Sequence, residues 1–145
     1  MYHTLIQQCE GINPYEVDAN WLIPYGDLLP ITCILYIYLY LVGKQAAKWS
    51  DMIHYESSPG YRCLKDGAID WVKYLSLVSK VLCFSEVQYN SYMEPVPKVF
   101  HCWALLGRSG CVLGAWCSCD AGHSQSCTHV QALLFTIEYD YRLNA

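Results

Sequence analysis

The chain has 145 residues, of which 54% are hydrophobic and 15% are charged, and its formal net charge is -4. This length and hydrophobic content suffice for one compact domain with a buried core, and they exclude a disordered chain. The nine lysines and arginines are scattered and form no basic block, so composition gives no support for binding the phosphates of a nucleic acid.

The nine cysteines are an odd number and are closely spaced only near the C-terminus, which fits a reducing compartment better than a secreted disulfide framework. The N-terminal sequence Met1 to Leu5 lacks the basic and apolar regions of a secretory signal. We therefore expect an intracellular protein, nuclear or cytoplasmic. The sequence is also compatible with a segment of a longer protein.

Residues 1 to 27 mix glycine, proline, asparagine and aspartate with single large hydrophobes, which predicts a loop-rich lead-in. The following run from Leu28 to Val42 is the only stretch that suggests a membrane segment. It is shorter than the roughly 20 apolar residues that a spanning helix needs, and it contains tyrosines. From Ile31 to Val42 the apolar residues lie all round a helical wheel, so we predict a buried helix.

Shorter elements are expected in the middle of the chain. Ser50 is a predicted N-cap because an acid follows it in the first turn, and Gly67 is expected to close a helical turn. The predicted elements are a short helix at 51–56, a break at 58–60, a helical turn at 61–66, and a pair of strands at 69–74 and 80–86.

The C-terminal third has the pattern of a ββα unit. Pro95 and Pro97 are expected to interrupt the chain before two strands, 99–106 and 111–117, which flank the four-residue turn at 107–110. After the second strand and a polar loop comes an apolar stripe with the spacing of an amphipathic helix. Its residues are Val130, Leu133, Leu134 and Ile137.

Four metal-binding side chains lie between the second strand and this helix. Cys117 and Cys119 form one close pair, and Cys127 and His129 form another. If the backbone bends at Ala121-Gly122, packing of the helix against the hairpin brings the two pairs together. Three thiolates and one imidazole fill the tetrahedral coordination of Zn²⁺ and leave no position for a reactive water, which is typical of a structural site.

Two alternatives remain for these residues. In the first, no metal binds: the three cysteines are small buried residues or disulfide partners, and the histidine lies on the helix surface. Cys111 and His123 are near enough in sequence to substitute as ligands, but Cys111 falls in the predicted strand and His123 in the connecting loop.

The motif Cys-x-Cys, seven residues, Cys-x-His and an apolar helix resembles the SWIM-type zinc finger. That resemblance implies a zinc site and binding to DNA or protein. The local sequence is most similar to the SWIM segment of invertebrate transposon-like proteins that carry a YqaJ-type viral recombinase exonuclease. The residues that carry this similarity are Cys-x-Cys-x-Ala-Gly followed by Cys-x-His-Val-x-Ala-Leu-Leu-Phe. A weaker likeness extends upstream to about Asn13.

Two residues depart from the pattern of that family. Asp120 stands where a neutral or basic residue is usual, and His123 stands where leucine is common. Neither change removes a ligand, but the carboxylate makes contact with nucleic acid less favourable. The sequence stops before any exonuclease domain, so the resemblance implies no nuclease activity.

We therefore predict an α+β protein, with a mostly helical N-terminal half beside a small antiparallel sheet that ends in the zinc unit. Residues 1–90 precede the finger region at 91–145, in one compact unit. The predicted function is a non-catalytic zinc-binding module that supports structure or protein interaction, with DNA binding as the alternative. No nucleophile elbow or phosphate-binding loop indicates an enzyme, and neither a membrane nor a small-molecule substrate is expected.

Between Val99 and Ala145 the basic residues are Arg108 and Arg142, and they are outnumbered by Asp120, Glu138 and Asp140. Three thiolates on one zinc add negative charge, so a protein partner is favoured over DNA. Trp103 and Trp116 are candidates either for that contact or for the core.

Overall fold

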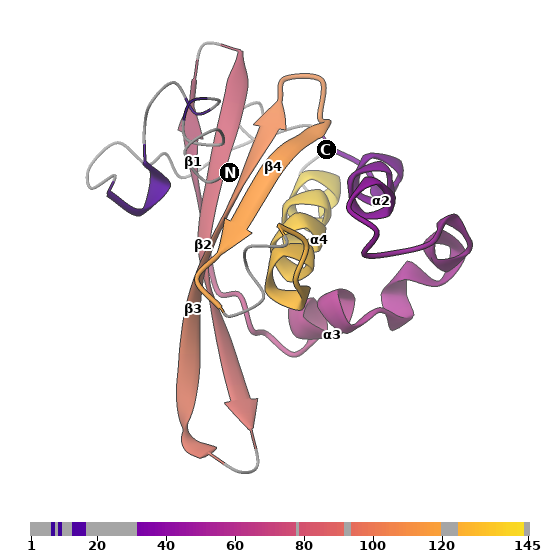
Figure 1. The fold of residues 1–145 in the computed structure, drawn as a ribbon. Helices are drawn as coiled ribbons and strands as arrows, with labels where there is room; N and C mark the ends of the chain where they lie inside the picture. Colours follow the sequence, from indigo (N-terminus) through magenta and orange to yellow (C-terminus); the bar gives the residue numbers. More distant parts are fainter. Residues whose placement is uncertain are drawn as a thin grey trace.

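The computed structural model describes residues 7, 9, 13–16, 32–77, 79–91, 94–119 and 125–143. Within these residues, three α-helices and two 3-10 segments (η) accompany four strands (Figure 1). In chain order the elements are η1 (Pro14–Glu16), α2 (Ile34–Gly43), η3 (Trp49–Ser57), α3 (Pro59–Lys65), β1 (Val72–Ser76), β2 (Lys80–Ser91), β3 (Glu94–Gly107), β4 (Val112–Cys117) and α4 (Thr128–Leu143).

The four strands form one antiparallel sheet in the order β1-β2-β3-β4. Strands that are consecutive in the chain are also neighbours in the sheet, as is usual for sequential strands. Strand β2 pairs with β3 from Lys80 opposite Gly107 to Ser91 opposite Glu94, so the sheet joins both halves of the chain. Helices and an antiparallel sheet in separate parts of the chain confirm the predicted α+β class.

Helix α4 covers one face of the sheet, and α2 and α3 lie beside it on the same side (Figure 1). The predicted stripe is confirmed, since Val130, Leu133, Leu134 and Ile137 are at most 1% exposed. These side chains pack with inward-facing strand residues such as Cys102 and Ala115 in the larger of two core clusters. Burial of four such side chains stabilises the ββα unit by about 1.5–3 kcal/mol each.

The opposite face of the sheet carries a second cluster. Trp103 is fully buried there with Leu82 and Leu105, and Trp116 packs against them partly buried. The alternation of the two faces follows from the two-residue period of a strand. Trp103 therefore belongs to the core and is not an exposed anchor for a partner.

Helix α2 confirms the helix predicted in the run from Leu28 to Val42, while residues 28–31 lie outside the described part. It is not buried all round, because Leu35 and Leu39 are each 54% exposed one turn apart. None of the described helices is long and apolar enough to cross a membrane.

The short helix that was expected to begin after Ser50 is instead the 3-10 segment η3, and Ser50 lies inside it. The Asp51 carboxylate accepts a hydrogen bond from the Lys48 backbone N–H at 3.0 Å, so an acid fixes the start of the segment. The Ser58 hydroxyl then caps α3 by accepting from the Tyr61 N–H. Gly67, with a φ of 74°, closes α3 as predicted.

The prediction that Pro95 and Pro97 interrupt the chain was wrong, because both lie within β3. The Ser118 N–H donates to the His101 carbonyl at 3.0 Å, so the backbone N–H and C=O groups of His101 point toward β4. The backbone groups of every second residue before His101 point toward this same outer edge of β3. Pro97 is on this outward phase, where its missing N–H breaks no bond to β2, and Pro95 falls in an irregularity of the register.

The contact of α3 with α4 leads to a prediction about Gly60. A Cβ atom at this position would lie 2.5 Å from the Gln131 Cβ and 3.2 Å from the Ala132 backbone nitrogen. Gly60→Ala is therefore expected to lower the free energy of unfolding by about 1–3 kcal/mol, because α3 must move away from α4. Urea denaturation measures this change.

Gly43→Ala is the matched control, since no atom lies within 4 Å of a Cβ built at Gly43. Equal stability of the two variants would contradict the close contact of α3 with α4.

Candidate metal centre

The end of β4 and the start of α4 position the four predicted ligands. Cys117 is the last residue of β4, and Cys119 follows it after one residue. Cys127 immediately precedes α4, and His129 is in its first turn. Packing of α4 on the sheet therefore brings together two pairs that seven residues separate in sequence. Residues 120–124, with the expected bend at Ala121-Gly122, lie outside the described part.

The ligand atoms of the four residues all lie within 4.8 Å of one another. The Nδ1 atom of His129 is 3.7 Å from the Cys117 Sγ and 3.9 Å from the Cys127 Sγ. Zinc bond lengths in tetrahedral geometry would place sulfur and nitrogen about 3.6 Å apart and two sulfurs about 3.8 Å apart. The side chains thus have both the chemistry and the spacing of a zinc-binding set.

The imidazole of His129 is held by an aromatic neighbour. The Phe100 ring, from β3, stacks on it with centroids 4.4 Å apart and an interplanar angle of 23°. This contact orients Nδ1 toward the two sulfurs. Coordination through Nδ1 requires the proton of a neutral imidazole to be on Nε2.

The thiols at this centre are poor acids in the absence of a cation. The adjacent Cys117 thiol, followed by burial, raises the pKa of Cys127 to about 12, against the opposing effects of His129 and the Val130 N–H. The adjacent Cys102 thiol and burial raise the pKa of Cys117 above its ordinary range. A bound divalent ion would replace these protons and neutralise most of the thiolate charge, so metal binding is expected to release protons.

The centre opens onto a cavity of about 440 Å³ beside α3. The cavity is lined by Cys119, Cys127 and His129 together with α3 residues that include Arg62 and Cys63. Cys117 is only 1% exposed, whereas the other three ligands are partly exposed. Solutes therefore reach the centre from the side of Cys127, and Cys117 is its interior member.

Helix α2 anchors the segment that leads into the second ligand pair. The Tyr40 hydroxyl donates to the Gln125 carbonyl oxygen, two residues before Cys127. Gln125 has a φ of 64°, an unfavourable left-handed conformation for a residue other than glycine. The Gln131 side chain also donates to the Ser126 carbonyl oxygen at 3.1 Å. These bonds fix the path of the chain into α4.

Among the described residues, no other sequence candidate joins the set. Cys111 lies before β4, with its sulfur near the Ser109 hydroxyl, and His123 is outside the described residues. The histidine of β3, His101, pairs with Glu86 at 3.2 Å. All nine cysteines, which lie in the described residues, are free thiols, so the structure does not support the disulfide alternative.

Sequence reasoning missed three residues next to the centre: Tyr40, Phe100 and Cys102. Tyr40 is 85 residues from its partner, and no local pattern signals that bond. Cys102 lies directly opposite Cys117 in the β3–β4 hairpin. If the two strands that flank the predicted turn at 107–110 are paired in a regular ladder, this cysteine comes close to the ligands.

Comparison with protein families, with curated proteins and with solved structures finds no match to this chain. The feature of the described residues that points to a function is the Cys3His cluster, which could bind a metal ion.

The bond between Tyr40 and Gln125 gives a testable prediction. Tyr40→Phe is expected to weaken zinc binding by roughly 5- to 10-fold, because it removes one buried hydrogen bond, worth about 1 kcal/mol or slightly more, that fixes the ligand segment. Competition with a chromophoric chelator measures the affinity. Tyr36→Phe, on the same helix, is the control, and equal affinities would show that α2 does not preorganise the site.

Proposed function

We propose that this chain is a non-catalytic zinc-binding module in which the metal joins the β3–β4 hairpin to α4. The observation that carries the proposal is the cluster of three cysteine sulfurs and one imidazole nitrogen within 4.8 Å of one another. Metal binding then contributes directly to folding, on the order of 10 kcal/mol in small zinc modules.

A structural role is favoured because the protein supplies four ligands. Catalytic zinc sites keep a coordination position for water or substrate, and this set of Cys117, Cys119, Cys127 and His129 would leave none. The stacking of Phe100 on the histidine ring adds a rigid wall beside the metal. These features support a site that holds elements together.

Membership of the SWIM-type zinc-finger group is part of the proposal. It is supported by the Cys-x-Cys and Cys-x-His spacing and by the order of two strands, ligand segment and apolar helix. The proposed origin in a transposon-derived protein rests only on the similarity of the motif residues to those of transposon-like proteins.

Protein interaction is favoured over DNA binding because the two arginines between Val99 and Ala145 are already engaged. An Arg108 Nη donates to the Ser76 hydroxyl and to the Leu77 carbonyl oxygen, each at 2.6 Å. Arg142 pairs with Glu138 at 3.2 Å. Each phosphate contact needs a cation, so few are left for a nucleic acid.

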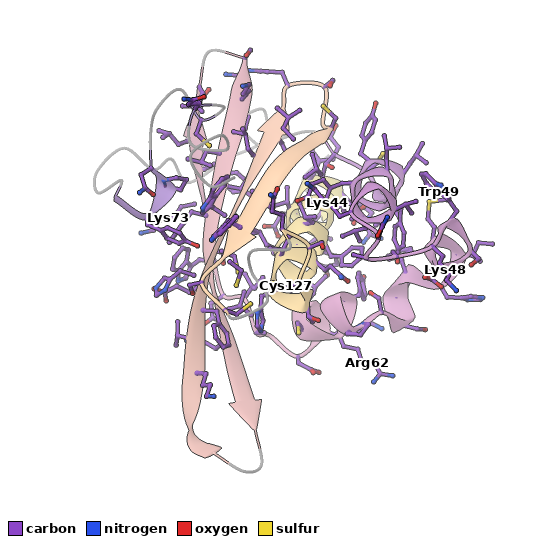
Figure 2. All side chains as sticks on the ribbon, viewed as in Figure 1. Lys44, Lys48, Trp49, Arg62, Lys73 and Cys127 are labelled. Carbon is purple, nitrogen blue, oxygen red and sulfur yellow. The ribbon has the colours of Figure 1, made fainter. Side chains whose placement is uncertain are left out.

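The basic residues of the N-terminal half do not all lie on one surface, although Arg62 lines the cavity beside the candidate metal centre. Figure 2 shows Lys73 beside the sheet, away from Lys48 and Arg62 on the helical side. The helical side instead exposes large apolar residues, which suits contact with a protein. They are Leu35, Leu39, Trp49 and Ile53.

The metal itself is the first test. Purified chain is expected to contain one zinc per molecule, and X-ray absorption should show three sulfurs and one nitrogen around it. An oxygen ligand in the native protein would contradict a closed structural site.

Cys119→Ser is expected to weaken zinc binding by more than the roughly 10- to 100-fold that loss of an outer-shell partner costs. Helix content and thermal stability should fall with metal content, because the ion joins α4 to the hairpin. Cys111→Ser is the matched control, since this cysteine lies outside the cluster. Equal metal content in both variants would refute the assigned ligands.

The second test separates protein interaction from DNA binding. Zinc-loaded chain is expected to bind labelled duplex or single-stranded DNA only weakly, with a dissociation constant of about 10⁻⁴ M or higher at physiological salt and a shallow salt dependence. Micromolar binding that weakens steeply with salt and is lost in the Arg108→Ala, Arg142→Ala double variant would favour the DNA-binding alternative. Stability of that variant must be measured in parallel, because both arginines make internal contacts.

A further inference from the structure

Cys102 places a fourth thiol against the zinc-binding cluster of three cysteines and one histidine. Its sulfur is 3.0 Å from the Cys117 Sγ, closer than the 3.7 Å that separates the same sulfur from His129 Nδ1. Cys102 is fully buried, and Cys117 is 1% exposed. The interior member of the ligand set therefore has a metal site on one side and a free thiol on the other.

The backbone geometry permits a disulfide between these two residues. Cys102 and Cys117 are direct partners in the ladder of β3 and β4. The next pair, His101 and Ser118, shares a backbone hydrogen bond at 3.0 Å, so the cysteines occupy a non-hydrogen-bonded position. Cα atoms at such positions are about 4.5 Å apart, within the range that disulfides span. Closing the bond requires the sulfurs to approach by about 1 Å, to the usual length of about 2.05 Å.

We propose that Cys102 is a resolving thiol for the zinc centre: under oxidation it forms a disulfide with Cys117, which removes one zinc ligand and releases the metal. The loss of zinc in this proposal rests on the proposed zinc-binding function. The disulfide itself does not, because the two thiols face each other without a metal.

An oxidant can enter through the half-buried ligand Cys127, which lines the cavity. A hydroperoxide such as hydrogen peroxide converts the Cys127 thiolate to a sulfenic acid and releases hydroxide. The Cys117 thiolate displaces a second hydroxide and forms a disulfide with Cys127. One hydroxide takes the proton of Cys102, and the resulting thiolate attacks the Cys117 sulfur and restores the Cys127 thiolate.

The net reaction converts one thiolate, one thiol and one hydrogen peroxide to one disulfide, one water and one hydroxide. Two electrons pass from the two sulfurs to the peroxide. The remaining set of Cys119, Cys127 and His129 offers three ligands, so zinc affinity falls. Because the disulfide is inside the core, it stores the oxidised state away from the cavity through which the oxidant entered.

The arrangement of tryptic sites makes the test direct. Residues 99–108 form one tryptic peptide whose single cysteine is Cys102, while the three ligand cysteines and Cys111 share the peptide 109–142. Zinc-loaded full-length chain would be treated with hydrogen peroxide, with released zinc followed by a chromophoric chelator. After the remaining thiols are alkylated, mass spectrometry would detect any link between the two peptides, and fragmentation would locate it.

We expect a link between Cys102 and Cys117 that grows in proportion to zinc release, and both should reverse on reduction and resupply of zinc. Disulfides confined to peptide 109–142, or oxidation that leaves peptide 99–108 alkylated, would overturn the proposal. A parallel arm with metal-free chain, which is titrated with zinc and separately oxidised, distinguishes the two hypotheses. A chain that forms the link but binds no zinc would refute the zinc module, whereas a chain that binds zinc but forms no link would refute the resolving thiol.

The Cys102→Ala variant checks that Cys102 is not itself a ligand. It is expected to bind one zinc with an affinity within a few-fold of the unmodified chain, whereas loss of the metal would assign Cys102 to the coordination set and overturn its role as a resolving thiol. Cys83→Ala, at another fully buried cysteine of the same core cluster, controls for the loss of a core sulfur.

Discussion

The packing of α4 against the sheet is the contact on which the rest of the site depends. Cys117 and His129 come from elements that meet only because the apolar stripe of α4 is buried against β3 and β4. Hydrophobic burial is not directional, so by itself it would leave the position of α4 adjustable by small shifts along the sheet. Ligation by directed bonds would fix that position, and the two effects together define the junction more sharply than either alone.

Contacts from residues around the cluster also fix the positions of the ligand segment and of α4. Tyr40 holds the entering segment through the Gln125 carbonyl, Phe100 holds the imidazole, and α3 approaches α4 closely at Gly60. Each of these contacts joins residues far apart in sequence, and the shortest separation is the 29 positions between Phe100 and His129. Helices α2 and α3 of the N-terminal half thus shape the site together with Phe100 of β3, and the N-terminal half contributes none of the four clustered ligands.

The parts of this structure that the sequence could predict are those set by local periodicity and spacing. The stripe from Val130 to Ile137 predicts α4 because its period matches one helical face, and the four ligands follow from their pairing. The type of η3 could not be derived, because Asp51 supports a turn start in either a 3-10 or an α-helix. The contact of Cys102 with Cys117 depends on strand register, and the bond of Tyr40 to Gln125 depends on tertiary packing.

The two prolines of β3 have a consequence for the ribbon that β2 and β3 form beyond the rest of the sheet (Figure 1). A two-stranded ribbon with a free edge is a template on which another chain can add a strand, and this is a common start of aggregation. Pro97 has no N–H to offer on the outer side of β3, and Pro95 has none within the irregular register next to it. A foreign strand would find the outer ladder interrupted where the ribbon projects furthest. The outer edge of β3 is therefore a poor template for pairing with another copy of the chain where the ribbon extends beyond the rest of the sheet.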